Sequence, residues 1–189
     1  SQQKAIYQIV LQSFERAESL LKPGTPYQQI HLEVAKVMVE GLKSLGIMKG
    51  NTEAAVKEGA HAMFFPHGVG HLLGLDVHDM EDLGDLAGYA SGRERSKRFG
   101  LGFLRLDRPL QAGMVVTIEP GFYQVPGILD DVTMRKTYGE IVNWQRLEQF
   151  ADVRGIRIED DVLITEDGCE VLTAALPTNA DAIEKLVKA

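Results

Sequence analysis

The period of the hydrophobic pattern changes near residue 64, and this change most limits what the chain can fold into. Before it, apolar residues recur every three or four positions over 6–21 and again over 30–45, the spacing of amphipathic helices. Beyond it, short apolar runs are separated by glycines, which is typical of strands and turns. The 189 residues contain no internal repeat and no low-complexity linker, so the pattern predicts one domain of the α+β class.

The first two predicted helices have clear ends. The first stops at 22–24, a Lys-Pro-Gly sequence that cannot continue it. The second is expected to begin at Thr25, because Pro26 suits the first helical position and Gln28 completes a Thr-x-x-Gln capping box. Gly46 fits a left-handed C-terminal cap for this helix. Further helices are expected over 52–58, 139–150 and 181–188.

The later part of the chain predicts strands and one long loop. Strands are expected over 115–119, 155–160, 162–165 and 170–173. Pro120-Gly121 is expected to end the first, and Glu166-Asp167-Gly168 predicts a hairpin turn between the last two. Residues 79–110 lack clear periodicity. A stretch that long without regular structure is more often functional than idle, so we expect it to form a wall of an active site.

Composition narrows the class of protein. A net charge of -7 argues against a non-specific nucleic-acid binder, and no apolar run is long enough to span a membrane. The single cysteine, Cys169, cannot form an intrachain disulfide, which favours a reducing, cytoplasmic location. Because Cys169 follows the predicted hairpin turn, we interpret it as a small strand residue rather than as a nucleophile.

Three of the five histidines lie close together, at His67, His71 and His78. Gly68 and Gly70 disfavour a helix, and no glutamate follows the first histidine, so the helical His-x-x-x-His zinc motif is excluded. In an extended segment His67 and His71 share a face and can point into one site. One such histidine alone would be interpreted as structural, but three among glycines favour a functional site.

A glutamate ends the strand predicted over 115–119. Val116 and Ile118 would face the core. Thr117 and Glu119 would face the other way. An acid in this place is costly to bury unless its charge is compensated. A metal cation is one compensating partner, and a salt bridge is the other.

The strand predicted over 155–160 has the same alternation. Ile156 and Ile158 fall on one face, and Arg157 and Glu159 on the opposite face. A surface ion pair between Arg157 and Glu159 is one interpretation. In the functional interpretation, Glu159 is a metal ligand and Arg157 holds a substrate or a group beside the metal.

One imidazole and two carboxylates make a hard donor set that suits Mn²⁺, Co²⁺ or Zn²⁺ in a hydrolytic site. Two metal ions would need more ligands than these three residues provide. The sequence therefore predicts a site of hydrolytic metal chemistry with an incomplete set of donors.

These motifs resemble those of the pita-bread metallopeptidases, and within them those of prolidase and the Xaa-Pro aminopeptidases. The residues that carry the resemblance are the runs 64–71, 76–79, 117–121 and 157–160, and Lys22-Pro23-Gly24 and Glu40-Gly41-Leu42 extend it through the helices. The resemblance implies the pita-bread (creatinase/aminopeptidase-like) fold. It covers nearly the whole chain.

The resemblance also implies a site for two divalent ions, Mn²⁺ first and Co²⁺ or Zn²⁺ as alternatives, held by two aspartates, a histidine and two glutamates. His71, Glu119 and Glu159 match the last three ligands. No aspartate precedes Asp76, whereas the family's two aspartates come earlier, on a hairpin before the first helix. We therefore expect residues 1–189 to be the C-terminal part of a catalytic domain, truncated at its N-terminal hairpin, and to be inactive by themselves.

For the full-length protein the resemblance implies cleavage of the Xaa-Pro bond of a small peptide, by a dipeptidase or an aminopeptidase. Glu119 would be a ligand and general base, and His67 and His78 would line the site, stabilising the intermediate, binding substrate or moving protons. Arg157 would contact substrate. Alignment back from Leu110-Gln111-Ala112-Gly113 places Arg105 where it would hold the free carboxylate of a dipeptide, which favours a dipeptidase.

Other members of this fold bind peptides or protein partners without metal chemistry, and such a module is the alternative function. Retention of His71, Glu119 and Glu159 argues against it for the full-length protein. A homodimer is expected for that protein, with no nucleic-acid or membrane partner.

Overall fold

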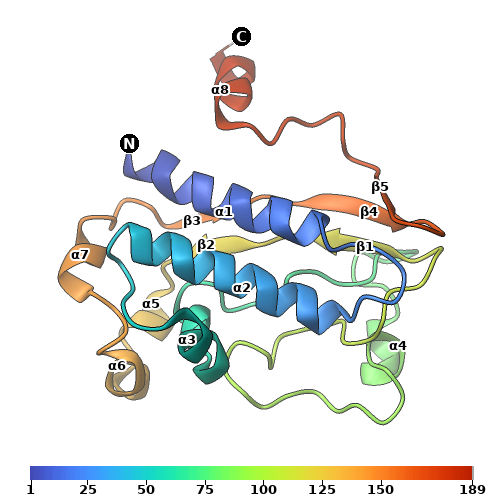
Figure 1. Ribbon diagram of the computed structural model, residues 1–189, viewed down its shortest axis with the longest axis horizontal. Helices are drawn as coiled ribbons and strands as arrows, with labels where there is room; N and C mark the ends of the chain where they lie inside the picture. Colours follow the sequence, from blue (N-terminus) through green and yellow to red (C-terminus); the bar gives the residue numbers. More distant parts are fainter. Residues whose placement is uncertain (189) are drawn as a thin grey trace.

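Two long helices cover one face of an interrupted antiparallel sheet (Figure 1). The computed structural model describes residues 1–188. The helices α1 (Gln2–Glu18) and α2 (Tyr27–Ser44) lie side by side, and the shorter α3 (Thr52–Glu58) packs below α2 (Figure 1). They approach closely at Gly41, where a Cβ atom would fall 2.6 Å from Ile9 Cγ2. A glycine is therefore needed at this helix contact.

The strands form two antiparallel groups that continue one another. In the first, β4 (Asp160–Ile164) pairs with both β1 (Val115–Ile118) and β5 (Cys169–Val171). In the second, β2 (Gly121–Tyr123) pairs with β3 (Gly155–Arg157). The register of the β1–β4 pair continues without a shift into the β2–β3 pair. β1 with β2, and β3 with β4, therefore act as one long antiparallel pair that is interrupted once.

Short helices and loops complete the chain. They are η1 (Ala60–Met63), η2 (Glu81–Leu83), α4 (Asp85–Gly88), α5 (Pro126–Leu129), α6 (Val132–Tyr138), α7 (Trp144–Glu148) and α8 (Ala180–Lys188). α8 lies against the first turn of α1, where Lys4 forms ion pairs with Asp181 and Glu184. None of the helices between residues 1 and 188 has the length and apolar character needed to cross a membrane.

Several predicted elements are confirmed. The helix over 52–58 has the expected bounds, and Gly46 has a φ of +74° just beyond α2. The hairpin around 166–168 joins β4 to β5, and Thr165 N donates to Gly168 O at 3.0 Å. The stretch 79–110 contains only η2 and α4, so it is mostly irregular, as its lack of periodicity predicted.

The capping box at Thr25 is wrong. Helix α2 begins at Tyr27, and Pro26 occupies the N-cap position without a side-chain hydrogen bond. The cause is tertiary: Pro26 bridges Pro109, and Thr25 O accepts a hydrogen bond from Leu110 N at 2.9 Å, which holds this segment extended. The side chain of Gln28 instead donates to Asp107 Oδ2 at 3.1 Å.

Two further boundaries differ from the prediction. The strand over 115–119 does end before Pro120, as predicted, but a strand that was not predicted, β2, begins directly at Gly121. The helix expected over 139–150 is only Trp144–Glu148, and α5 and α6 precede it. The aromatic and apolar residues of this region pack individually onto the core instead of along one helix face.

The core holds two fully buried histidines beside its aliphatic residues. His31 comes from α2 and His61 from η1, and their ring centroids lie 5.7 Å apart. Burial lowers the pKa of His31 to about 3 and that of His61 to about 4, because a charged imidazole would lose its hydration. The positive charge of Arg98 also lowers both values. Both rings are therefore neutral in the folded protein near pH 7.

We expect the free energy of unfolding to fall as the pH is lowered from about 6.5 toward 4. In this window the unfolded chain protonates both histidines, whereas the folded chain keeps them neutral, so acid favours unfolding. Each histidine contributes a slope of about 1.4 kcal/mol per pH unit once its unfolded form is protonated. Urea denaturation at several pH values measures this slope. His31→Gln should make it shallower, and an unchanged slope in that variant would contradict the assignment.

Candidate metal centre and adjoining cavity

Two glutamates lie opposite each other where the long strand pair is interrupted. The common register of β1–β4 and β2–β3 places Glu119 directly across from Glu159, and Pro120 across from Ile158. Like charges in this arrangement repel. Partial burial and the charge of Glu119 both raise the pKa of Glu159. This position therefore needs a compensating positive charge.

The segment that carries His71 runs alongside β1, on the side away from β4. Glu119 N donates to Val69 O at 2.7 Å, and Thr117 N donates to His71 O at 3.0 Å. Leu72 bridges Val116 in the antiparallel sense. The segment is thus extended, as its glycines predicted, and it brings an imidazole to the two carboxylates.

The ring of His71 is oriented by its own backbone neighbourhood. Its Nδ1 lies 2.8 Å from the carbonyl oxygen of Leu72, so Nδ1 carries the proton and donates it. Nε2 then has a free lone pair, and it lies 3.3 Å from Glu119 Oε1. This is the tautomer that a metal-binding histidine needs.

Thr117 is hydrogen-bonded to both sides of this contact. Its Oγ1 accepts from His71 N at 3.1 Å and donates to Glu119 Oε1 at 3.4 Å. Its carbonyl oxygen accepts from the hydroxyl of Tyr27 at 2.5 Å. Tyr27 is fully buried at the start of α2, so the helix layer is tied directly to the strand that carries Glu119.

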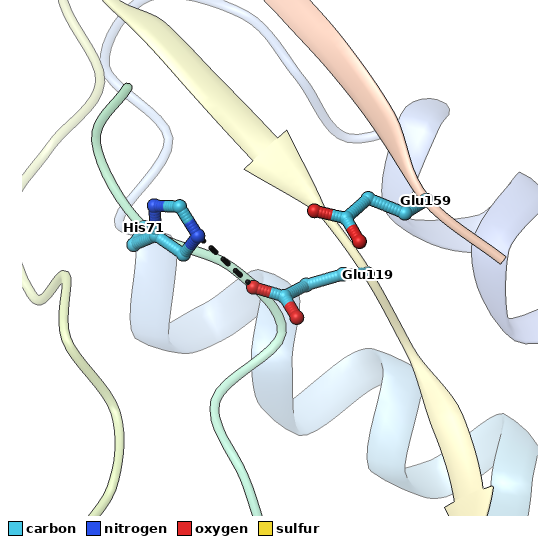
Figure 2. A group of neighbouring side chains, drawn as sticks. All are labelled: His71, Glu119 and Glu159. Atoms are coloured by element: carbon cyan, nitrogen blue, oxygen red, sulfur yellow. Dashed lines mark ion pairs between the residues drawn. The ribbon is translucent and has the colours of Figure 1, made fainter. Parts of the chain in front are cut away.

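His71, Glu119 and Glu159 offer one donor atom each, all within 4.8 Å of one another. Figure 2 shows the three side chains pointing toward a common point from three separate segments. One imidazole nitrogen and two carboxylate oxygens form a donor set that fits Mn²⁺, Co²⁺ or Zn²⁺. The structure thus brings together the three residues that the sequence analysis selected as ligands.

Arg157 balances the charge of Glu119 from the cavity side. Its Nη1 lies 2.5 Å from Glu119 Oε2, and its Nε donates to the hydroxyl of Tyr123 at 2.5 Å. Its Nη2 lies 3.5 Å from Nε2 of His67. The ion pair of Arg157 is therefore with Glu119 rather than with Glu159.

A cavity of about 400 Å³ opens beside the three donors. It is lined by Pro66, His67, Gly68, Gly70, His78, Phe103, Arg105, Glu119 and Arg157. Burial lowers the pKa of His67. Nδ1 of His67 lies 2.7 Å from Gly68 O, so in the neutral ring Nδ1 donates and Nε2 is an acceptor. The cavity thus contains two guanidinium groups and one glutamate that is already paired.

Arg105 enters the cavity from the irregular stretch 79–110, and His78 enters it from the loop just before that stretch. The ring centroid of His78 lies 4.4 Å from that of His71, in an edge-to-face arrangement. Glu81 contacts both residues: it forms an ion pair with Arg105, and its Oε2 lies 3.7 Å from Nδ1 of His78. The expectation that this stretch forms a wall of the site is supported by the position of Phe103 and Arg105 in the cavity lining.

Sequence reasoning missed two residues of the site and gave no role to a third. Tyr123 lies in β2, a strand that the sequence did not predict. It directly follows Pro120-Gly121-Phe122, and nothing in this sequence indicates a residue of the site. Glu81 is one of several acidic residues in an aperiodic loop, so nothing marks it. The alternation does place Thr117 on the face of β1 that carries Glu119, but it does not indicate the hydrogen bonds of Thr117 to His71 and Glu119.

Comparisons with a family model and with known proteins identify the same family of peptidases. The model of metallopeptidase family M24 matches residues 1–166. The chain is 38% identical to human Xaa-Pro dipeptidase over 182 residues, which is 96% of this chain and 36% of that protein. It is 38% identical to a probable Xaa-Pro aminopeptidase of Botryotinia fuckeliana over 184 residues, covering 97% of this chain and 38% of that protein. The chain thus spans about a third of the length of these relatives.

Solved structures show the same fold. Proline aminopeptidase P II from Yersinia pestis matches with a TM-score of 0.70 and 38% identity, covering 98% of this chain and 34% of that chain. Zinc-substituted Escherichia coli aminopeptidase P in complex with product matches with a TM-score of 0.67 and 37% identity, over the same shares of the two chains. The architecture described above is therefore that of the pita-bread fold.

Because Glu119 and Glu159 face each other, we expect the effect of Glu159→Gln on stability to depend on whether metal is present. In the metal-free chain, Glu159→Gln should raise the free energy of unfolding by about 0.2–1 kcal/mol, because it removes a like-charge pair across the strands. In excess Mn²⁺ the wild type should gain more stability than the variant, because the ion binds the folded form only. Urea denaturation in a chelator and in Mn²⁺ measures both effects.

Glu170→Gln is the matched control, since Glu170 lies on β5 opposite Leu163 and outside the site. It should leave both measurements unchanged. A loss of stability of Glu159→Gln in the chelator would reject the proposed repulsion, and an equal gain of both proteins in Mn²⁺ would reject Glu159 as a metal ligand.

Proposed function

Because the chain belongs to metallopeptidase family M24, we propose that the whole protein is a metal-dependent peptidase that cleaves the Xaa-Pro bond of small peptides. The observation that carries the proposal is the convergence of His71, Glu119 and Glu159 beside a cavity with two arginines. The donors suit a hydrolytic metal ion, and the arginines suit an anionic substrate group.

We propose that His71, Glu119 and Glu159 hold divalent metal, with Mn²⁺ as the first candidate and Co²⁺ or Zn²⁺ as alternatives. When bound, such an ion polarises a peptide carbonyl and makes water a stronger nucleophile. Two ions need more donors than these three, and relatives about three times as long leave room for them. Residues 1–189 alone are accordingly proposed to bind one ion weakly and to have negligible turnover.

The histidines of the cavity are proposed to handle protons and bind substrate. With its Nδ1 proton bound to Gly68 O, neutral His67 presents an acceptor at Nε2. It can accept a proton or an N–H group of the substrate, and it becomes a donor only after protonation. His78 lines the same cavity next to His71. Glu119, with one oxygen toward His71 and one toward Arg157, is proposed as both ligand and general base.

The two arginines are proposed to position the substrate. Arg157 is held by Glu119 and Tyr123, so its guanidinium is fixed beside the reacting groups. Arg105 lines the same cavity and has one exposed ion-pair partner, Glu81, which a substrate carboxylate could replace. A clamp at Arg105 would favour dipeptides, whose free carboxylate lies next to the scissile bond, over longer peptides.

We also propose that the whole protein is a cytoplasmic homodimer without nucleic-acid or membrane partners. Within residues 1–189, the single cysteine supports a reducing compartment, and the net charge of -7 opposes a role in binding nucleic acid.

Glu119→Gln in the whole protein should lower kcat/KM for Xaa-Pro peptides by roughly 10²-fold or more, because it removes one ligand charge and the proposed base. Hydrolysis of Xaa-Pro dipeptides in the presence of Mn²⁺ is the assay, with metal content measured in parallel. Glu170→Gln serves as the control. A fully active Glu119→Gln enzyme would reject the assignment, and a wild type that binds such peptides without hydrolysing them would favour the non-catalytic alternative.

Arg105→Ala should raise KM for Xaa-Pro dipeptides roughly 10- to 100-fold and change KM for longer Xaa-Pro peptides much less, because only the dipeptide loses a charge-assisted hydrogen bond to its carboxylate. Steady-state kinetics on a dipeptide and a tetrapeptide measure the difference. Arg108→Ala, in the same segment but outside the cavity lining, is the control. Equal effects on both substrates would refute the carboxylate clamp.

A further inference from the structure

The turn that carries Phe103 and Arg105 into the cavity is built around the carbonyl group of Arg98. The backbone N–H groups of Leu101 and Gly102 both donate to this oxygen at 3.0 Å. Within the turn, Gly100 has a φ of +87°, a conformation that favours glycine. Residues 98–105, which we call the wall turn, therefore determine where the two cavity residues lie.

The core side of the wall turn rests on the two buried histidines. Nε2 of His31 donates to the carbonyl oxygen of Gly100 at 2.9 Å. His61 packs against the same residue so closely that a Cβ atom on Gly100 would fall 2.6 Å from its Nε2. Both imidazoles are fully buried. They belong to α2 and η1, so they connect the wall turn to these two helices.

The other end of the wall turn is held at Leu104. The hydroxyl of the buried Tyr89 donates to Leu104 O at 2.6 Å, and the partly exposed Arg95 donates to the same oxygen at 3.0 Å. Gly68 lets the turn approach the histidine segment, since a Cβ there would fall 3.0 Å from Leu104 Cα. Leu104 O thus has two side-chain donors, whereas Gly100 O has His31 in the core, and loss of that bond would leave the carbonyl group of Gly100 unpaired.

The two histidines are costly core residues, and an apolar side chain would avoid that cost. Nδ1 of His31 and both ring nitrogens of His61 have no hydrogen-bond partner within residues 1–188. Burial of polar nitrogens without partners is unfavourable. The hydrogen bond from His31 to Gly100 O offsets part of this cost, and it ties the position of that carbonyl to the core.

We propose that His31 and His61 are positioning residues that fix the wall turn and thereby set the place of Phe103 and Arg105 in the cavity. Neither histidine lines the cavity or belongs to the three metal donors. Their effect should therefore fall on substrate affinity and on the mobility of the turn, and not on metal binding. The part that concerns substrate rests on the proposed peptidase function.

Their neutral state suits this role. A neutral imidazole keeps one N–H donor for Gly100 O, and burial keeps both rings uncharged near pH 7. Phe65 adds a direct contact toward the site: its ring lies 5.1 Å from His31 and 5.0 Å from His67, measured between centroids. The histidine pair thus contacts the cavity wall through Gly100 of the wall turn and, by way of Phe65, through His67.

Hydrogen exchange of the 189-residue chain tests the structural part without any need for activity. His31→Leu removes the donor, and amide exchange over residues 99–105 should rise roughly 3- to 10-fold relative to exchange in β1, as expected for one lost hydrogen bond. His31→Gln keeps an N–H donor at similar reach and should restore most of the protection. Val34→Ala, a buried substitution on the same helix, is the control for general destabilisation.

A rise confined to 99–105 in His31→Leu, with restoration by His31→Gln, supports the proposal. The same rise in Val34→Ala, or no rise in His31→Leu, overturns it whether or not the protein is a peptidase. His61→Phe should give a smaller local rise, because it keeps the packing against Gly100.

Kinetics of the whole protein test the consequence for substrate. His31→Leu should raise KM for Xaa-Pro dipeptides roughly 3- to 10-fold, with kcat and the affinity for Mn²⁺, measured by calorimetry, nearly unchanged. A loss of Mn²⁺ affinity equal to the loss of substrate affinity would overturn the positioning role, because it would mean general damage to the site. A wild type that hydrolyses no Xaa-Pro peptide would refute the proposed function instead, and the exchange result would stand by itself.

Discussion

The repulsion between two opposed carboxylates is the constraint on which the site depends. Glu119 and Glu159 face each other because the strand register is the same on both sides of the interruption. Arg157 supplies positive charge to one oxygen of Glu119. The other oxygen accepts a hydrogen bond from Thr117 and faces the lone pair of His71 Nε2. A divalent ion would complete this compensation. The fold thus compensates the negative charge of the two glutamates only in part, and a bound cation would compensate the rest.

The helix layer fixes the site through a few direct contacts. Tyr27 binds the carbonyl group of Thr117, and a Cβ atom on Gly70 would collide with both of these groups. The histidine segment can therefore run close to β1 only because residue 70 is glycine. The bond from His31 to Gly100 also connects α2 to the wall turn, which contributes Phe103 and Arg105 to the cavity. One helix thus contacts both the strand that carries Glu119 and the wall turn.

The sequence predicted the parts of the fold and site that local rules determine. Alternation along 115–119 and 155–160 identified Glu119 and Glu159, and glycines around His71 identified an extended segment; the structure brings all three together. The errors came from tertiary contacts. Thr25 does not cap α2 because 109–110 hold it extended, and β2 was missed because its residues are stabilised by pairing with β3. Glu81, which links His78 to Arg105, lies in a loop without any pattern.

The unbroken register across the strand interruption limits how this sequence can change over evolution. Two residues on each chain segment lie outside the paired strands, 119–120 between β1 and β2 and 158–159 between β3 and β4. An insertion of one residue on one side alone would turn every following side chain to the other face and separate the glutamates. Length changes here are tolerable only in matched pairs, so these two segments should gain or lose residues together among natural variants.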